Sequence, residues 1–160
     1  MHAFNHSRRL LGAAIAAVAV VTFAPTSAFA TKTASGEYNS LYAGLGAKGY
    51  DVVSYFSDKK PVKGSDKFTV PYGGVTWQFA SAEHRDTFKA HPEQYAPQYG
   101  GYCSWGVSQG KLFDVDPESG WTVSNGKLYL NFNGDINATF ARDVDGFVKK
   151  ANMNWPDLNK

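Results

Sequence analysis

Two side chains in this sequence could carry metal or thiol chemistry, Cys103 and His84. Cys103 is the only cysteine in 160 residues, and His84 is one of four histidines. A thiolate is both a nucleophile and a ligand for soft metal ions, and a neutral imidazole binds copper or zinc. A site for copper or zinc would therefore combine His84 with Cys103 or with a tyrosine, brought together by the fold. A helix N-terminus and a nearby imidazolium would lower the pKa of the thiol.

The single thiol leaves two alternatives to a metal site open. Cys103 has no resolving partner in its own chain, so thiol redox or sensing would need an external molecule. A free cysteine can also be a small buried hydrophobic residue, which would leave a protein-interaction module with an aromatic surface. No nucleophile elbow, phosphate-binding glycine loop or zinc-protease helix occurs in the sequence, which favours a non-enzymatic protein.

Three further residues, Tyr50, Asp51 and Tyr102, are candidates for ligand binding. Tyrosines can line a pocket and give it a polar rim. Asp51 could orient His84 or cap a turn. The glycines of Gly100–Gly101 allow another group to approach the backbone closely beside Tyr102.

The elements that must position these residues begin with a hairpin at Gly73–Gly74. Glycine tolerates the positive φ angles of a two-residue turn, and apolar and polar side chains alternate on both sides of it. Counting outward from the turn gives the pairs Tyr72 with Val75, Val70 with Trp77, and Phe68 with Phe79.

Asn125–Gly126 predicts a second hairpin, because this dipeptide favours the tight turn that joins two antiparallel strands. Tyr129 and Asn131 would lie on its outer face. The expected core face holds the cross-strand pairs Val123 with Leu128 and Trp121 with Leu130, followed by Phe132.

Helices are expected between and after the hairpins. Ser81 is a favourable N-cap for a helix from Ala82 to about Ala90. Pro92 suits the first position of a short turn over Pro92–Tyr95. Apolar residues at helical spacing predict a last helix from about Asp143 to Asn152, which Trp155–Pro156 would end.

Residues 1–30 are typical of a cleaved export signal. Arg8 and Arg9 precede the uncharged apolar run Leu10–Ala24, which is shorter than the about 20 residues that span a bilayer. Ala28–Ala30 fits the pattern that a signal peptidase cleaves. We expect a periplasmic or secreted protein that begins at Thr31 and has no integral membrane segment after cleavage.

Charge limits the partners of the processed chain. Removing Arg8 and Arg9 from the sixteen basic residues leaves fourteen, which equals the fourteen acidic residues. A nucleic-acid partner would favour an excess of positive charge. The expected partners are therefore a metal ion, a small molecule or an exported protein, and not a nucleic acid.

The sequence predicts one small α+β domain. Residues 31–49, rich in glycine, serine and alanine, would form an approach segment to a folded domain over residues 50–156. Tyr50–Phe56 has the β-branched and aromatic composition of a strand. We expect the two antiparallel hairpins to form a sheet that packs against two or three short helices.

From Tyr50 onward the chain resembles the YHS domain family, and in particular its small exported members. The resemblance implies a small α+β module with a role in metal binding. It rests on Tyr50–Phe56 (YDVVSYF), Tyr72–Phe88 (YGGVTWQFASAEHRDTF), Pro92–Gly110 (PEQYAPQYGGYCSWGVSQG), Trp121–Phe132 (WTVSNGKLYLNF) and the closing Trp155–Pro156.

The resemblance also bears on individual positions. The usual pattern of the family has one early cysteine and a Cys-x3-Cys pair after the second hairpin strand, and here the matching positions hold Ser54, Ala80 and His84. Exported members share the segment Gly100–Cys103, and selenocysteine replaces its cysteine in some of them, which implies reactive chemistry there. The expected function is an exported, non-enzymatic accessory protein that binds a metal or ligand around Cys103 and His84.

Overall fold

The structure is a computed structural model that describes residues 38–39 and 42–160. The predicted export signal, residues 1–30, lies outside the described residues, and so do residues 31–37 of the expected approach segment. The 3-10 helices (η), helices and strands in chain order are η1 (Gly46–Gly49), α1 (Ser54–Ser57), β1 (Ser65–Tyr72), β2 (Val75–Phe79), α2 (Ala82–Ala90), α3 (Pro92–Tyr95), η2 (Tyr99–Gly101), α4 (Ser104–Ser108), β3 (Trp121–Ser124), β4 (Lys127–Leu130), α5 (Gly134–Ala141) and α6 (Val144–Leu158).

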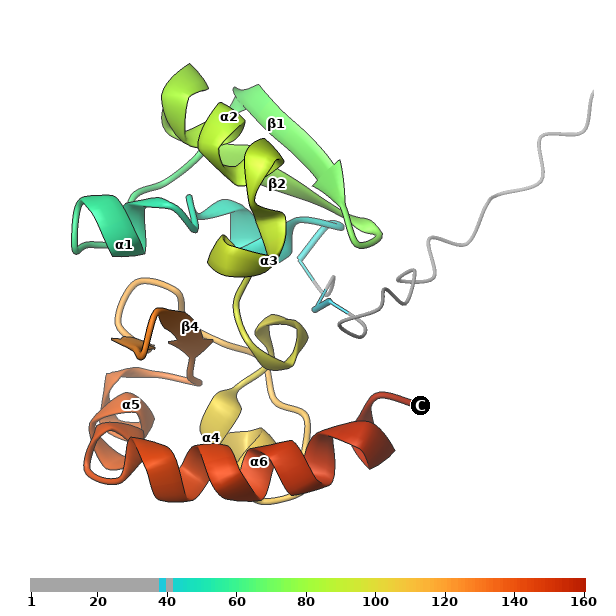
Figure 1. The fold of residues 1–160 in the computed structure, drawn as a ribbon, viewed down its shortest axis with the longest axis vertical. Helices are drawn as coiled ribbons and strands as arrows, with labels where there is room; N and C mark the ends of the chain where they lie inside the picture. Colours follow the sequence, from blue (N-terminus) through green and yellow to red (C-terminus); the bar gives the residue numbers. More distant parts are fainter. Residues whose placement is uncertain (1–37, 40–41) are drawn as a thin grey trace, which may run out of the picture.

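The fold is a small single α+β domain, as predicted, but the hairpins form two separate sheets. β1 pairs with β2 and β3 pairs with β4, both antiparallel, and neither pair bonds to the other. Different elements cover them, since α2 contacts β1 and β2 while α5 contacts β3. Figure 1 shows the first hairpin with α2 at one end of the molecule and α6 along the other. The expectation of one common sheet is therefore wrong.

The first hairpin turns at Gly73–Gly74, as predicted. Tyr72 faces Val75 and Val70 faces Trp77. The expected pair of Phe68 with Phe79 is wrong, because the register shifts between Ser65 and Thr69 and brings Ser65 opposite Phe79. The extra residues of β1 form a bulge, which leaves Phe68 half-buried at the edge of the core. In β2, every second residue is buried: Val75, Trp77 and Phe79.

The predicted strand at Tyr50–Phe56 is wrong, because this segment forms a turn and the short helix α1. The Asp51 carboxylate accepts hydrogen bonds from the backbone N–H groups of Val53 (2.9 Å) and Ser54 (3.3 Å). An aspartate that bonds the backbone two or three residues ahead offers the chain an alternative to a strand. Val52 and Val53 are nevertheless buried, as their apolar character requires.

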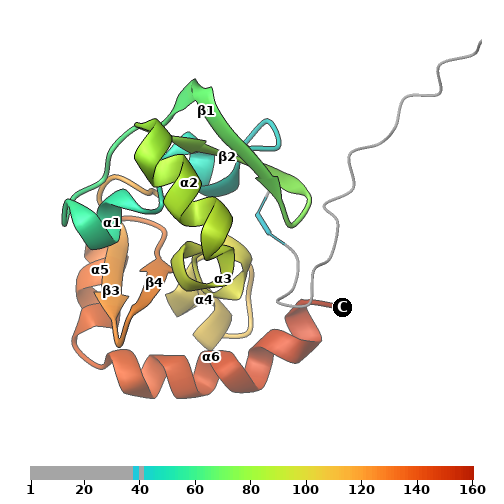
Figure 2. The ribbon, with the colours of Figure 1, turned by 45° about the horizontal axis from the view of Figure 1, so that its top comes forward.

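The second hairpin has the predicted pairs, but its strand β4 is buried on both faces, while β3 is half-buried. Leu128 and Leu130 belong to a first core cluster with Trp77. Tyr129 lies in a second cluster, where its ring centroid is 5.5 Å from that of Phe140 in α5. The expected outward position of Tyr129 is wrong because α5, which the sequence analysis does not predict, covers that face. Figure 2 shows β3 and β4 beside α5.

The two residues that follow Tyr129 and Leu130 differ from the prediction in opposite ways. Asn131, expected on the outer face, is fully buried, and its side-chain amide donates to Asn137 Oδ1 at 2.9 Å. Phe132, expected in the core, is 51% exposed. Both lie beyond the end of β4, so the alternation of a strand no longer governs where their side chains point.

The predicted helices α2 and α3 have the expected bounds, and the Ser81 side chain caps α2 by accepting from His84 N–H. The last helix, α6, is longer than predicted and continues through Trp155–Pro156 to Leu158. Pro156 lies inside this helix and has no N–H to donate to the carbonyl four residues earlier, and Asn159 N–H donates to the Trp155 carbonyl to close the last turn.

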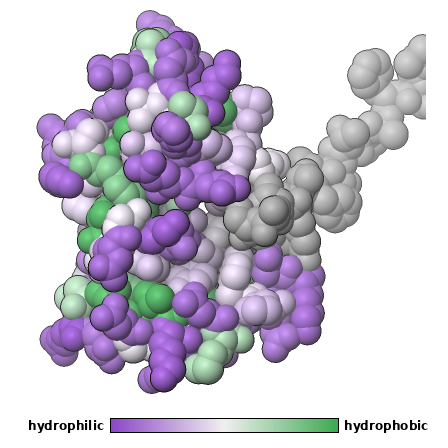
Figure 3. Space-filling model, viewed as in Figure 1, coloured by the Kyte–Doolittle hydropathy of each residue, from purple (hydrophilic) through white to green (hydrophobic). Residues whose placement is uncertain are grey.

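Hydrophilic residues cover most of the face in Figure 3, and apolar surface is visible beside α1 and beside α5. Among the residues that the structure describes, none of the helices has both the length and the apolar character needed to cross a bilayer.

Candidate functional site

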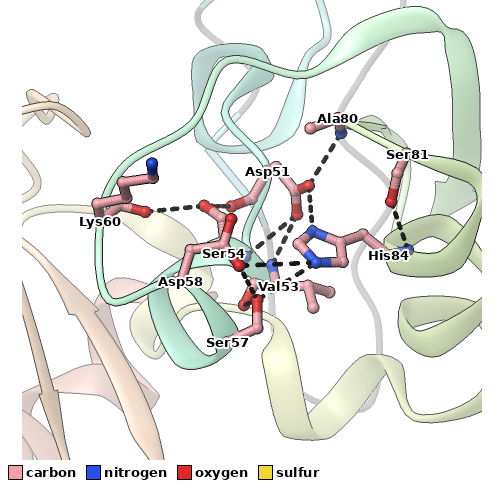
Figure 4. A network of polar contacts seen from close by, with 9 residues as sticks. All are labelled: Asp51, Val53, Ser54, Ser57, Asp58, Lys60, Ala80, Ser81 and His84. Carbon is pink, nitrogen blue, oxygen red and sulfur yellow. Dashed lines mark hydrogen bonds and ion pairs between the residues drawn. The ribbon is translucent and has the colours of Figure 1, made fainter.

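A buried carboxylate, Asp51, lies at the centre of the polar network in Figure 4. Its side chain is fully inaccessible to solvent. Oδ1 accepts from the backbone N–H groups of Val53 and Ser54, and Oδ2 accepts from Ala80 N–H at 2.9 Å. Oδ2 also lies 2.7 Å from His84 Nδ1. A buried charge needs such partners, and together they join the start of α1, the end of β2 and the first turn of α2.

His84 presents its other ring nitrogen to the opposite side of this network. A carboxylate can only accept a hydrogen bond, so Nδ1 carries the proton and Nε2 of the neutral ring has the free electron pair. Nε2 lies 3.3 Å from Ser57 Oγ and 3.9 Å from Asp58 Oδ1. The His84 side chain is 17% exposed. Asp51 could orient His84 or cap a turn on sequence grounds, and in the structure it does both.

A pocket of about 260 Å³ lies between α1, α2 and α3 beside His84. Val53, Phe56 and Tyr95 contribute apolar and aromatic surface to its lining, and Ser57 and His84 contribute polar groups. The rings of Phe56 and Tyr95 pack edge to face with their centroids 5.2 Å apart. The imidazole therefore lies at a small, partly apolar hollow rather than on a flat surface.

The site has the order of groups found in a catalytic triad: an acid (Asp51), a base (His84) and a hydroxyl (Ser57). The Ser57 hydroxyl, however, has a closer acceptor than His84. Ser57 Oγ donates to Asp58 Oδ1 at 2.7 Å, which is shorter than its 3.3 Å distance to His84 Nε2. A serine hydroxyl has one proton, and the shorter bond directs it to Asp58. The arrangement therefore favours Nε2 as a ligand for a cation over Nε2 as a base for Ser57.

The donor atoms fit a metal ion only in part. Among residues 38–39 and 42–160, no group of three or more His, Cys, Asp and Glu side chains is arranged to hold one. His84 Nε2 and Asp58 Oδ1 are 3.9 Å apart. Bonds of about 2 Å from one ion to each atom would have to lie almost in line to span this distance, so a tetrahedral ion requires Asp58 to move closer to Nε2. The remaining coordination positions would be open to water or to another molecule.

Cys103 lies in a different environment, with its side chain fully buried in the first core cluster. It is the N-cap of α4, where its Sγ accepts from Gly106 N–H at 3.4 Å and lies 3.8 Å from Asn131 Oδ1. Burial raises the pKa of the thiol, and hydrogen bonds from backbone N–H groups oppose this only in part. The expected lowering of the thiol pKa is therefore wrong.

The structure brings Asp51 to His84 but gives Cys103 and His84 no common hydrogen-bond partner. Their shared site stays a prediction without a supporting contact.

Tyr50, another ligand-binding candidate, has contacts of its own. Its hydroxyl donates to Glu118, and Lys63 Nζ lies 4.2 Å from the centre of its ring.

Tyr102, the remaining ligand-binding candidate, is half-buried and packs against the second core cluster. Its ring centroid is 6.5 Å from that of Trp155 in α6. The turn before it uses Gly100 and Gly101 in left-handed conformations, with φ of 61° and 77°. These glycines therefore allow a tight backbone turn.

Ser57 and Asp58 are the site residues that the sequence analysis missed. Ser57 is the last residue of α1 and Asp58 is its C-cap, and the helix places both beside His84. Because Tyr50–Phe56 was predicted as a strand, nothing directed attention to the residues at the end of this segment. Asp51 was the sequence signal for α1, because aspartate is a favoured residue at the start of a helix.

The YHS domain family model matches residues 53–99, which confirms the predicted resemblance. Metal binding is proposed for this family. The three positions at which the resemblance implies cysteines in the family lie around the Asp51 carboxylate, which accepts from the backbone N–H groups of Ser54 and Ala80 and from His84 Nδ1. Comparison with curated proteins and with solved structures gave no match.

Proposed function

We propose that this protein, whose residues 53–99 carry a YHS domain, is an exported, non-enzymatic accessory protein that binds a copper or zinc ion at His84. One observation carries the proposal: the buried Asp51 carboxylate lies 2.7 Å from His84 Nδ1. A carboxylate that accepts from one ring nitrogen fixes the orientation of the imidazole and makes the other nitrogen a better ligand.

Asp58 is the proposed second ligand. Its Oδ1 lies 3.9 Å from His84 Nε2, and its side chain is 35% exposed, so it can move slightly at little cost. Two carboxylates, those of Asp51 and Asp58, flank the imidazole and attract a cation by simple electrostatics. A site with one nitrogen and one oxygen ligand leaves positions for water or a partner's ligand, which suits an exchangeable ion better than a structural one.

Cys103 has no ligand role in this proposal. Its thiol is fully buried, and burial raises its pKa, so the thiolate that a soft metal ion or a disulfide exchange requires is disfavoured. Its hydrogen bond from Gly106 N–H supports a role in packing and in capping α4. The thiol redox alternative would require the core around Cys103 to open.

Titration calorimetry with Zn²⁺ and Cu²⁺ tests the proposal on metal-free protein recovered from the periplasm of an expression host. We expect one ion per chain, and we expect His84→Gln to weaken binding by at least about tenfold, the cost of losing one good ligand. His91→Gln is the matched control, because His91 ends α2, is exposed and lies outside the His84 pocket. Cys103→Ser should bind as the wild type does.

Three results would contradict parts of this proposal. Equal affinity of wild type and His84→Gln, or no binding to the wild type, would exclude the metal site at His84. Loss of binding in Cys103→Ser would restore the thiolate–imidazole site. Cleavage of the export signal is read from the intact mass of the same preparation, which should begin at Thr31, and a product that begins at Met1 would contradict cleavage.

A further inference from the structure

A second pocket, of about 370 Å³, lies where the two core clusters meet and shares no lining residue with the His84 pocket. Its lining comes from Tyr38, from α3, from the turn that follows α3, from β4 and from α6. Pockets that bind small molecules are commonly of this size and lie between packed units of a fold. This pocket is therefore a candidate binding site that the proposed metal site does not use.

Opposite charges line this pocket. Glu93 of α3 and Lys127 of β4 both contribute to it, and both side chains are exposed. In the part of the chain that the structure describes, neither forms an ion pair. A carboxylate and an ammonium group that are not paired with each other or with neighbours are both available to a ligand.

Two aromatic residues that line this pocket are held in place by their contacts. Tyr99 is 7% exposed, and its hydroxyl donates to Asn152 Oδ1 at 2.9 Å. The ring of Trp155 packs edge to face against that of Tyr99, with their centroids 5.9 Å apart. Rings fixed in this way present a surface that a ligand meets without reordering it, which lowers the entropic cost of binding.

We propose that this pocket binds a small zwitterion with an aromatic or aliphatic body, of the size of a free amino acid. The ligand carboxylate pairs with Lys127, and its ammonium group pairs with Glu93. The apolar body lies against Trp155 and Tyr99, where a nearby ammonium group is also attracted to the ring faces. Because both charges are needed, a molecule that lacks either charge binds more weakly.

Calorimetry with L-phenylalanine and two analogues tests this. N-acetyl-L-phenylalanine lacks the ammonium group, and L-phenylalanine amide lacks the carboxylate. We expect L-phenylalanine to bind with one site per chain and each analogue to bind about tenfold more weakly, the effect of one charge-assisted contact. No binding of L-phenylalanine at millimolar concentration, or equal affinities for all the probes, overturns the proposal.

Two variants assign the charges to their partners. Lys127→Gln should lower the affinity for L-phenylalanine about tenfold and leave that for the amide unchanged, since the amide has no carboxylate to lose. Glu93→Gln should also lower the affinity for L-phenylalanine about tenfold, and it should leave the affinity for the N-acetyl analogue unchanged, since that analogue has no ammonium group to lose. If either variant weakens all the probes alike, the assigned pairing is wrong.

Matched controls lie on β1, far along the chain from this pocket. Lys67→Gln and Asp66→Asn change exposed residues that do not line it, and both should bind L-phenylalanine as the wild type does. His84→Gln should also bind normally, so failure of the metal proposal and failure of this one are distinguishable. Loss of binding in His84→Gln would show that the ligand lies in the other pocket.

Discussion

Asp51 is the residue on which the geometry of the His84 site depends. Its carboxylate accepts from Val53, Ser54 and Ala80 N–H groups and from His84 Nδ1, although these donors lie up to 33 positions from Asp51 along the chain. Burying a carboxylate is costly, and hydrogen bonds from several donors offset that cost. The same contacts that orient His84 therefore also contribute to stability.

We expect Asp51→Asn to lower the free energy of unfolding by about 3 kcal/mol, because an amide nitrogen cannot accept from the two donors that Oδ2 serves. Ala80 N–H and His84 Nδ1–H would then lose their acceptor inside the protein. Urea denaturation followed by circular dichroism measures this. Asp66→Asn, an exposed position on β1, should change the value by less than about 0.5 kcal/mol. An equally small effect at Asp51 would contradict the network.

At the scale of elements, β2 is held against η1 by a close contact between Trp77 and Gly46. Trp77 is 1% exposed, and its indole N–H donates to the Tyr72 carbonyl at 3.0 Å. A Cβ atom added at Gly46 would lie 2.6 Å from the indole ring. Only glycine allows this approach. η1 precedes residues 53–99, which match the YHS family model, yet it packs on the hairpin that lies within those residues.

Gly46→Ala should therefore destabilise the protein by about 2 kcal/mol, the usual cost of overpacking a core. Gly134→Ala is the matched control, because its Cβ would lie 3.6 Å from Ser119, an ordinary contact, at the start of α5. We expect that control to be neutral or slightly stabilising, since alanine favours helix. Thermal unfolding of both variants decides the point, and equal melting temperatures would mean that Trp77 can move aside.

At the scale of the whole molecule, β4 joins two cores that each contain a buried tyrosine. Tyr55, in the first core cluster, donates to the Pro117 carbonyl at 2.7 Å, and Tyr99, in the second, donates to Asn152. Burial raises the pKa of both phenols well above the usual range, as it also raises the pKa of the Cys103 thiol. The folded protein therefore loses these protons at higher pH than the unfolded chain does.

Stability should accordingly fall at alkaline pH. In the unfolded chain a thiol ionises near pH 8.5 and a phenol near about pH 10, while the folded protein resists both ionisations. The unfolded state thus gains free energy of ionisation above these values, and the free energy of unfolding decreases as pH rises. Urea denaturation from neutral to strongly alkaline pH measures the decrease. Tyr55→Phe should reduce its slope above about pH 10, and an unchanged slope would contradict this assignment.

The parts of the fold that the sequence predicts correctly are those with local causes. The Gly73–Gly74 and Asn125–Gly126 turns adopt positive φ in the structure, and Ser81 caps α2 as its position before a helical segment indicates. Such turns and caps depend on a few adjacent residues. The candidate site was predicted only in part: His84 and Asp51 were identified from the sequence, but Ser57 and Asp58 were not.

Several errors share one physical origin, which is that contacts from distant segments decide which face of an element is buried. Tyr129 was predicted to face outward because a hairpin needs only one covered face, but α5 and α6 cover the other. Asn131 was also expected on the outer face, yet it is fully buried and accepts a hydrogen bond from Trp105 N–H, 26 positions away in the chain. Packing of this kind overrides local propensity and leaves no pattern in the segment itself.

By itself, the sequence determined the α+β class, the positions of the turns, the first turn of α2 with His84, and the resemblance to the YHS family. Only the tertiary structure decided that Cys103 is buried away from solvent and that His84 is bound to Asp51. The reason is that turns and caps are short-range effects, whereas the surroundings of a side chain depend on which distant segments pack against it. The chemistry of both residues follows from those surroundings.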